Sequence, residues 1–248
     1  MRRSCLIFAA IGMVSTAGLA AAQPADLPLS PLAHAIACSP PPSLDGTPPH
    51  ALRIIGSQDT IPRNLFGDRD LLVLGGGTAA GVQLGQQFFI RRTMTFGGNQ
   101  ISRGAKTLGW LRVVAVNETT AIARVDEVCG GIMIDDYLVP FVPPEIPPAV
   151  ESNDIVGQPD FATLGRIVVG NEDRSTVGGG EFVLIDWGKT QGVLPGARFA
   201  IYRNVAEGLP LVSVGEGVVI SMGANLALTR VTRARDAVYN GDLVAFRR

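Results

Sequence analysis

The sequence predicts an all-β protein made of two tandem small domains, each a β-barrel or β-sandwich, related by internal duplication. Three observations predict this class. Short runs of alternating or continuous apolar residues recur between turn residues, one stretch of the chain repeats another, and no segment keeps an amphipathic 3.6-residue period over three turns. The composition agrees, because 30 glycines and 17 prolines among 248 residues make a chain rich in turns.

The chain begins with the three parts of a secretory signal peptide. Arg2 and Arg3 form a positive region, Cys5–Leu19 is apolar, and Ala20–Ala22 fits a small-residue cleavage site. The apolar run is about 15 residues, whereas roughly 20 are needed to span a bilayer, which leaves an uncleaved anchor as the less favoured alternative. We therefore expect residues 1–22 to be removed from an exported protein, periplasmic or associated with the outer membrane, that has no transmembrane span after cleavage.

Two cysteines, Cys38 and Cys129, remain after this cleavage. An even pair in an exported chain predicts a disulfide, and two buried free thiols are the alternative. The bridge would close a long loop, to which the chain-entropy model assigns roughly 4 kcal/mol of stability. Cys38 lies in residues 23–50, a Pro-rich segment that we expect to be extended and tethered by this cysteine.

The clearest repeat begins at a strand-like run in each half of the chain. Leu72–Arg92 aligns without gaps with Val183–Arg203 at an offset of 111 residues. The identical pairs are Gly77 and Gly188, Gly81 and Gly192, Val82 and Val193, Gly85 and Gly196, Phe88 and Phe199, Ile90 and Ile201, and Arg92 and Arg203. The second and third of these glycine pairs are predicted to occupy tight turns that favour a positive φ.

The repeat continues after a loop whose length differs between the two halves. Gly109–Phe141 aligns with Gly215–Arg247 at an offset of 106 residues. The recurring charged residues are Arg124 with Arg230 and Asp136 with Asp242. Because the two aspartates stand at predicted turns, they suit the capping of a turn by a carboxylate.

The repeats set the domain boundaries. Upstream of both aligned blocks, the segment that begins at Ile54 resembles the one that begins at Val168, so that each unit spans about 80–90 residues. We expect repeat 1 over residues 51–142, a stiff Pro-rich linker over residues 143–160, and repeat 2 over residues 161–248.

Both repeats are predicted to be β-structure in the same order. A short apolar run rich in β-formers comes first, and runs that alternate apolar and polar residues follow it. We expect strands in repeat 1 at Asp70–Leu74, Phe88–Arg92, Leu111–Val116 and Ala121–Val125. The equivalent strands in repeat 2 are Phe182–Asp186, Phe199–Arg203, Val218–Met222 and Ala227–Val231. Ordered domains of about five to seven strands usually close as small barrels or sandwiches.

Two segments resemble phosphate-binding loops. Gly75–Ala80 follows an apolar strand and fits G-x-G-x-x-A, but a turn and a strand follow it where a dinucleotide site needs a helix. Gly188–Thr190 resembles the end of a P-loop, but the first glycine of that motif would fall at Val183, inside a strand. We expect both segments to be turns, and we expect no bound cofactor.

No constellation of side chains indicates catalysis or metal binding. The two histidines, His34 and His50, lie in the Pro-rich segment, and no cluster of Cys, His or carboxylate side chains has the spacing of metal ligands. The G-x-S-x-G nucleophile motif does not occur, and the formal net charge of −1 gives no indication of nucleic-acid binding. We therefore expect a protein that is not an enzyme and has neither a metal site nor a nucleic-acid partner.

Three residues are weak candidates for contact with a ligand. Arg124 and Arg230 recur on the polar phase of a strand, where a solvated or cross-strand charge is the default. Trp187, with Trp110 and Tyr202, could form an aromatic platform for a glycan, although core or edge packing is the default for these rings.

The repeat pattern resembles a known family. Gly188–Arg203 fits G-x-x-x-G-V-x-x-G-x-x-F-x-I-x-R, and Gly215–Ile220 and Arg235–Val244 fit the G-x-G-V-V-I and R-x-x-V-x-x-G-D-x-V segments that follow it. This pattern is similar to the C-terminal β-domain of the flagellar assembly protein T family and to the β-repeats that follow LysM modules in exported bacterial proteins. The resemblance implies a small β-domain with a scaffolding role in the periplasm or at the outer membrane, sometimes near peptidoglycan or the flagellar basal body.

These observations predict a non-catalytic cell-envelope protein, a scaffold or binding module that contacts an envelope protein or peptidoglycan. One alternative is a hydrolase or accessory enzyme acting on envelope polymers, which would need a polar cleft between the repeats that uses Asp186, Glu216 or Asp242. The other alternative is a component of flagellar assembly or of the basal body.

Overall fold

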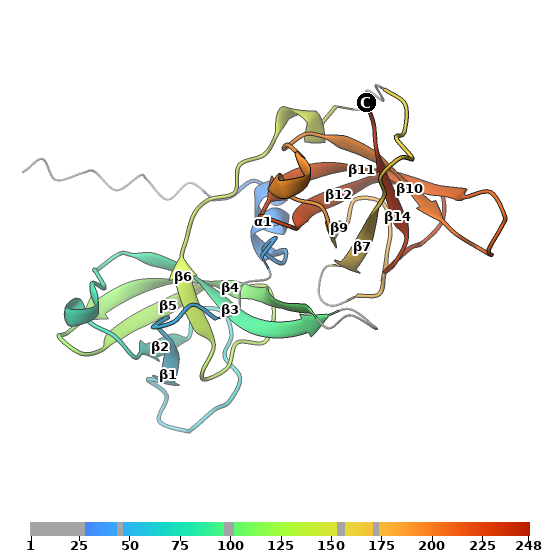
Figure 1. Cartoon of the computed structure of the whole chain (residues 1–248). Coiled ribbons are helices and arrows are strands. Elements are labelled where there is room, and N and C mark those ends of the chain that lie inside the picture. The colour runs from blue at the N-terminus through green and yellow to red at the C-terminus, as the bar shows by residue number, and fades with distance from the viewer. Residues whose placement is uncertain (1–27, 44–46, 97–101, 153–156, 171–173) are drawn as a thin grey trace, which may run out of the picture.

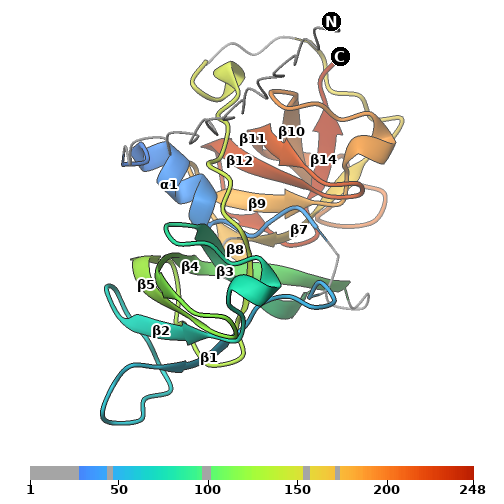
Figure 2. The same cartoon turned by 90° about the vertical axis from the view of Figure 1, so that its left-hand side faces the viewer.

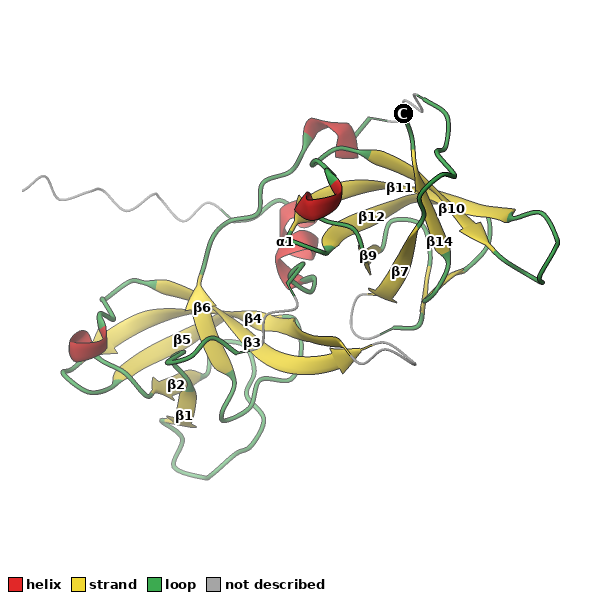
Figure 3. Cartoon of the chain, viewed as in Figure 1, coloured by secondary structure: helices red, strands yellow, loops and turns green. Residues whose placement is uncertain are grey.

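The computed structural model describes residues 28–43, 47–96, 102–152, 157–170 and 174–248. These residues form two β-units and a short α-helix, which confirms the predicted all-β class (Figure 1, Figure 3). The predicted signal peptide, residues 1–22, lies outside the described part of the chain.

Repeat 1 forms a six-stranded antiparallel sheet. Its strands are β1 (Ile54–Ser57), β2 (Leu71–Leu74), β3 (Gln87–Phe96), β4 (Ser102–Val116), β5 (Ala121–Val128) and β6 (Tyr137–Pro140). They lie in the order β1-β2-β5-β4-β3-β6. The two edge strands approach each other, because Arg53 forms an isolated bridge with Tyr137 and the Ile54 N–H donates to the Asp136 carbonyl at 3.0 Å. The sheet therefore curls towards a barrel.

Repeat 2 forms a closed barrel of six strands. They are β7 (Gly165–Gly170), β9 (Phe182–Ile185), β10 (Arg198–Arg203), β11 (Val212–Met222), β12 (Ala227–Ala234) and β14 (Leu243–Phe246). Their order is β10-β11-β12-β9-β7-β14, and pairing of β14 with β10 closes the barrel. Two short strands, β8 (Thr176–Val177) and β13 (Val238–Tyr239), form a separate small sheet.

The two repeats share one strand order and one set of bulges. Matched along the chain, β1-β2-β5-β4-β3-β6 corresponds to β7-β9-β12-β11-β10-β14. The register shifts between Ile90 and Arg91 in repeat 1 and between Ile201 and Tyr202 in repeat 2, positions that the sequence alignment also matches. β4 and β11 each carry two further shifts at matched positions. Because a β-bulge bends its strand, both sheets bend at the same places.

The predicted match upstream of these strands is wrong by one residue. It aligns Ile54 with Val168, but Ile54 pairs with Leu74, and Ile167 pairs with Ile185, the equivalent of Leu74. Ile54 therefore corresponds to Ile167, and both side chains are buried. A shift of one residue moves every side chain of a strand to the other face of the sheet, so burial fixes the register. The last three residues of the second segment lie outside the described part of the chain.

All eight predicted strands are present, although several are longer than expected. The expected strands Phe88–Arg92 and Leu111–Val116 are parts of β3 and β4, which extend together as a hairpin beyond the core of repeat 1. The extra residues mix polar and apolar side chains, and Met94, Ala105 and Leu108 among them are buried.

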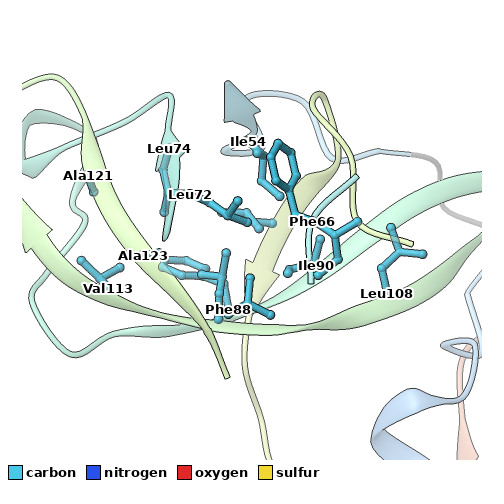
Figure 4. Packing of buried hydrophobic residues seen from close by; sticks show 14 of the residues in the cluster. Ile54, Phe66, Leu72, Leu74, Phe88, Ile90, Leu108, Val113, Ala121 and Ala123 are labelled. Carbon is cyan, nitrogen blue, oxygen red and sulfur yellow. The ribbon is translucent and has the colours of Figure 1, made fainter. Parts of the chain in front are cut away.

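Each repeat has its own hydrophobic interior. In repeat 1 the inward side chains of the sheet point towards one another (Figure 4). They include Ile54, Phe66, Leu72, Leu74, Phe88, Ile90, Leu108, Val113, Ala121 and Ala123. The barrel of repeat 2 encloses Ile167, Val183, Ile185, Phe199, Ile201, Val219 and Ala227. Full burial of each large aliphatic or aromatic side chain stabilises the fold by about 1.5–3 kcal/mol.

The expectation of an extended N-terminal segment is wrong for α1 (Pro31–Cys38), which is an α-helix. The Ser30 side chain accepts a hydrogen bond from the Ala33 N–H at 3.2 Å, and Pro31 opens the helix, where its missing N–H and fixed φ are tolerated. The helix lies between the two repeats (Figure 2). Its Ile36 packs on the outer face of repeat 2, and its Ala37 packs against repeat 1.

Two non-glycine residues of repeat 1 have a left-handed backbone at positions where repeat 2 has glycine. Arg69 has a φ of 64° where repeat 2 has Gly180 at 90°, and Asp135 has a φ of 70° where repeat 2 has Gly241 at 92°. Left-handed conformation costs an L-residue roughly 1–2 kcal/mol, and glycine escapes this cost but loses more chain entropy on folding. Asparagine and aspartate tolerate this conformation better than arginine does, so the strain is greatest at Arg69.

Replacement of Arg69 by glycine is therefore expected to raise the free energy of unfolding by about 0.5–1 kcal/mol. Denaturant titration of residues 23–248 measures the change. Arg69→Ala is the matched control, because it removes the side chain but keeps the strained backbone, and it should leave stability nearly unchanged. A gain as large in the alanine variant would show that the side chain, and not the backbone, is responsible.

Candidate functional site

The four turn glycines predicted from the repeat have left-handed backbones. The φ angles are 79° at Gly81, 78° at Gly85, 74° at Gly192 and 83° at Gly196. Gly81 and Gly85 lie between β2 and β3, and Gly192 and Gly196 lie between β9 and β10. Gly81 and Gly192 each end a short 3-10 helix.

The segments that resemble phosphate loops use their N–H groups within the fold. Thr78 and Ala79 N–H donate to the carbonyls of Asn117 and Glu118, at 2.8 and 3.1 Å. In repeat 2, Lys189 and Thr190 N–H donate to the carbonyls of the equivalent hairpin at 3.1 and 3.0 Å. A phosphate loop needs such N–H groups to be available to its ligand, so these two turns act as docking points between hairpins.

Asp136 and Asp242 cap turns and also form ion pairs. Asp242 accepts hydrogen bonds from Arg203 Nε and Nη2, both at 2.8 Å, and from the Tyr239 N–H at 2.8 Å. Asp136 is held in the same way by Arg92, at 2.7 and 2.8 Å, and by a turn N–H at 2.7 Å. These networks tie one strand to a turn and serve the fold. The sequence signal for these networks is the recurrence of both partners, since Arg92 matches Arg203 and Asp136 matches Asp242.

The three weak ligand candidates do not gather in one place. Arg124 Nη2 lies 3.0 Å from the carboxylate of Asp126 on its own strand. Arg230 Nε donates to the Gly180 carbonyl at 3.3 Å. Trp187 stacks on Phe246, with ring centroids 5.0 Å apart and planes at 10°, and it packs against the interior of repeat 2.

The carboxylates proposed for a hydrolase each have a partner in the fold. Asp186 Oδ1 accepts a hydrogen bond from the Arg166 N–H at 2.6 Å, and partial burial raises the pKa of Asp186 above its usual value. Glu216 Oε1 lies 2.8 Å from Arg247 Nη2. Asp242 is held by Arg203. None of these three carboxylates is among the residues that line the cleft described next.

A cleft of about 730 Å³ lies between the two repeats. We call it the inter-repeat cleft. Its walls are the end of α1 with the prolines after it, the Pro-rich linker, the outer face of β3 and the outer faces of β11 and β12. The lining residues are Ile36, Ala37, Ser39, Pro40–Pro42, Phe89, Arg91, Val142–Pro148, Lys189, Pro195, Ile220–Met222 and Leu228.

The two walls of this cleft that are not β-strands, the end of α1 and the Pro-rich linker, are both held on the β-units. Cys38 at the end of α1 is bonded to Cys129 of repeat 1, with Cα atoms 5.4 Å apart, which confirms the predicted disulfide. The Thr107 hydroxyl donates to the Ser39 carbonyl at 3.0 Å. The linker is held on repeat 2 by Arg198, whose Nη2 donates to the Ala149 carbonyl at 2.7 Å. The cleft is therefore formed before any ligand arrives.

Arg91 is the distinctive polar group of the cleft. Its Nε is buried and has no hydrogen-bond partner in the described part of the chain. Its guanidinium lies over the ring of Phe89, 5.2 Å from the centroid, and burial lowers the pKa of Arg91. Lys189 also lines the cleft, and Glu145 is the carboxylate among the lining residues. A largely apolar cavity with a few polar groups and a perturbed titratable residue is the usual form of a ligand site.

A second, smaller cavity of about 290 Å³ lies in repeat 1 beside the disulfide. Leu65, Met94, Leu108 and Met133 are among its lining residues, and its Arg92 is held by Asp136. In the described residues no three His, Cys, Asp or Glu side chains are grouped as a metal site. Over the same residues, no helix combines the length and the hydropathy needed to cross a membrane.

Comparison with known proteins assigns no family. Neither protein-family models nor curated proteins match this sequence. The function is therefore inferred from the chemistry of the inter-repeat cleft.

Proposed function

We propose that this protein is a non-catalytic, exported module of the bacterial cell envelope that binds peptidoglycan or an envelope protein through the inter-repeat cleft. The observation that carries the proposal is the cleft itself, a preformed cavity with apolar and proline walls and one guanidinium whose buried Nε has no hydrogen-bond partner among the described residues. Such a cavity has the size and composition of a small-ligand site.

Export is supported by two independent features. The N-terminal residues have the pattern of a signal peptide. The Cys38–Cys129 disulfide suits an oxidising compartment such as the periplasm, since cytosolic thiols are kept reduced.

A scaffolding role is supported by the way α1 joins the repeats. Ile36 packs in a cluster with Leu184, Val218 and other residues on the outer face of repeat 2. On the opposite side, His34 Nε2 lies 3.3 Å from Glu127 of repeat 1. A helix packed against both units resists their relative motion, which a scaffold requires.

We also propose that the repeats arose by duplication. The supporting observations are the shared strand order, the matched bulges and the paired arginine–aspartate networks. The cleft combines outer strand faces of both repeats with segments that the repeats do not share, which are α1, the prolines that follow it and the linker.

Binding is favoured over hydrolysis because of the charged groups that line the cleft. A glycosidase uses two carboxylates about 5–10 Å apart, and the described lining residues supply Glu145 alone. Arg91 and Lys189 instead suit the binding of an anionic group.

Co-sedimentation of the disulfide-bonded mature protein with purified sacculi tests the peptidoglycan arm of this proposal. A photoreactive residue in place of Val142, at the rim of the cleft, tests the protein arm by cross-linking in cells. Ser221→Trp, which fills the cleft, should abolish the interaction, whereas Leu209→Trp at an exposed loop should not. If the wild-type protein neither sediments with sacculi nor forms a specific cross-link, the proposal is wrong.

A further inference from the structure

We propose that the inter-repeat cleft holds a short peptide by its free carboxylate, which pairs with the guanidinium of Arg91, and that this peptide is the stem peptide of peptidoglycan. The inference rests on the proposed function and specifies its ligand.

Arg91 stands where the fold itself does not require an arginine. On β3 the side chains of Phe88 and Ile90 point into repeat 1, so Phe89 and Arg91 are on the outer face. The equivalent residue in repeat 2 is Tyr202, whose ring packs against Phe161 with centroids 5.0 Å apart. An aromatic ring therefore satisfies this position in the same fold.

The surroundings of Arg91 leave its charge poorly compensated. Tyr137 and Thr107 are its neighbours across the sheet, on β6 and β4, and neither is an acid. Burial lowers the pKa of Arg91, and burial also raises the pKa of the Tyr137 hydroxyl, which therefore stays neutral at physiological pH. A buried charge is unfavourable unless it is paired, so the site favours the arrival of an anion.

A carboxylate is the anion that best fits these groups. A guanidinium presents a planar fork of N–H donors that matches the two oxygens of a carboxylate. Lys189 supplies a second cation from repeat 2, against the single lining carboxylate of Glu145, so the charged groups of the cleft favour a negative ligand. The Phe89 ring beneath the guanidinium holds its plane in place.

The form of the cleft favours a short peptide over a protein segment. Protein segments commonly dock by adding a strand to a free sheet edge. The strands that wall this cleft have no free edge, because β3, β11 and β12 are each paired on both sides. The volume of about 730 Å³ lies within the range of small-ligand sites. Prolines have carbonyls but no N–H, so these walls can accept hydrogen bonds from the N–H groups of a peptide.

Isothermal titration of the disulfide-bonded mature protein with soluble stem tetrapeptide tests the inference. We expect saturable binding that falls at least about tenfold when the terminal carboxylate is amidated, and at least about tenfold in Arg91→Met. Arg124→Met is the matched control, an arginine on an outer strand face paired with Asp126, and it should keep full affinity. A protein-derived peptide of equal length with a free C-terminus distinguishes the two sources of carboxylate.

The thermal stability of Arg91→Met separates a ligand contact from a structural role. Because the substitution removes a poorly paired charge, the variant should melt at the same temperature as the wild type or higher. Loss of binding together with a fall of several degrees would overturn the assignment, as would equal affinity for the amidated peptide. If Arg91→Met does not fold, amidation alone decides the outcome on the wild-type protein.

Failure of this inference can be told apart from failure of the proposed function. Sedimentation with sacculi that free stem peptide does not compete away would overturn the inference and leave the envelope-binding proposal intact. Tighter binding of the protein-derived peptide would overturn the stem-peptide assignment in favour of a protein C-terminus. No sedimentation and no cross-link would overturn both.

Discussion

Replacement of both Cys38 and Cys129 by serine is expected to lower the free energy of unfolding by about 4 kcal/mol. The bridge joins residues separated by 91 positions, so its loss frees a long loop in the unfolded chain. Loop entropy grows slowly with length, but for a loop of this size the chain-entropy model gives a value near the upper end of the usual range. Urea titration of residues 23–248 measures the change.

The same substitution should also loosen α1 and the cleft. Cys38 is the last residue of the helix, and its bridge fixes that end of α1 to repeat 1. Hydrogen exchange at the α1 amides should therefore accelerate much more than exchange in β10 or β12, whose partners are strands of repeat 2. Stem-peptide affinity should fall in parallel, since α1 and the prolines after it line the cleft.

Reduction provides the control for this prediction. Treatment of the wild-type protein with a reductant should reproduce the loss of stability, and the same treatment should leave the double serine variant unchanged. A wild-type protein whose unfolding is insensitive to reduction would show that the bridge contributes nothing to stability, and the expected value would then be wrong.

Much of the β-structure was predictable because each strand has one face on a core. The alternation in Phe88–Arg92 and Ala121–Val125 marks an inward row of Phe88, Ile90, Ala121 and Ala123, and these are buried. Because the repeats align, each strand of one repeat is also predicted from the matching segment of the other. The alignment also showed that the segments resembling phosphate loops are turns, because the matching segments of the two repeats do not share the motif. The predicted strands stop at Arg92 and start at Leu111, although β3 and β4 continue beyond these residues as a hairpin of mixed polar and apolar side chains.

Neither the helix nor the cleft could be predicted from the sequence, and the physical reasons differ. α1 has only eight residues, too few for a period to be recognised, and the prolines around it favour an extended chain. Ser30 followed by Pro31 was the one local sign of a helix start. The cleft depends on the packing of segments far apart in the sequence, and no local pattern encodes it. Arg91 looks like any outward residue of an alternating strand until its burial is known.

The second large effect is expected at the arginine–aspartate pair of repeat 2. Asp242→Ala should lower the free energy of unfolding by about 3 kcal/mol, since loss of one partner leaves the other charge uncompensated. The Asp242 side chain is 4% exposed and that of Arg203 is 23% exposed, which places the value at the lower end for buried pairs. Asp242 raises the pKa of Arg203 through its hydrogen bond. An arginine is protonated at neutral pH with or without such a partner, so Arg203 stays charged when Asp242 is removed.

A double-mutant cycle separates the pair from its surroundings. Arg203→Met and the double variant complete the cycle, and the double variant should be less destabilised than the sum of the single variants, with a coupling of about 1–3 kcal/mol. The same cycle on Arg92 and Asp136 should give a similar coupling, because the geometry recurs with contacts of 2.7–2.8 Å. The pair of Arg124 and Asp126 is the control. Arg124 is 49% exposed and Asp126 keeps Arg112 as a second partner, so Arg124→Ala should cost less than about 1 kcal/mol. Strictly additive effects in both repeats would mean that the recurrence of these residues reflects the turn-capping carboxylate alone and not the ion pair.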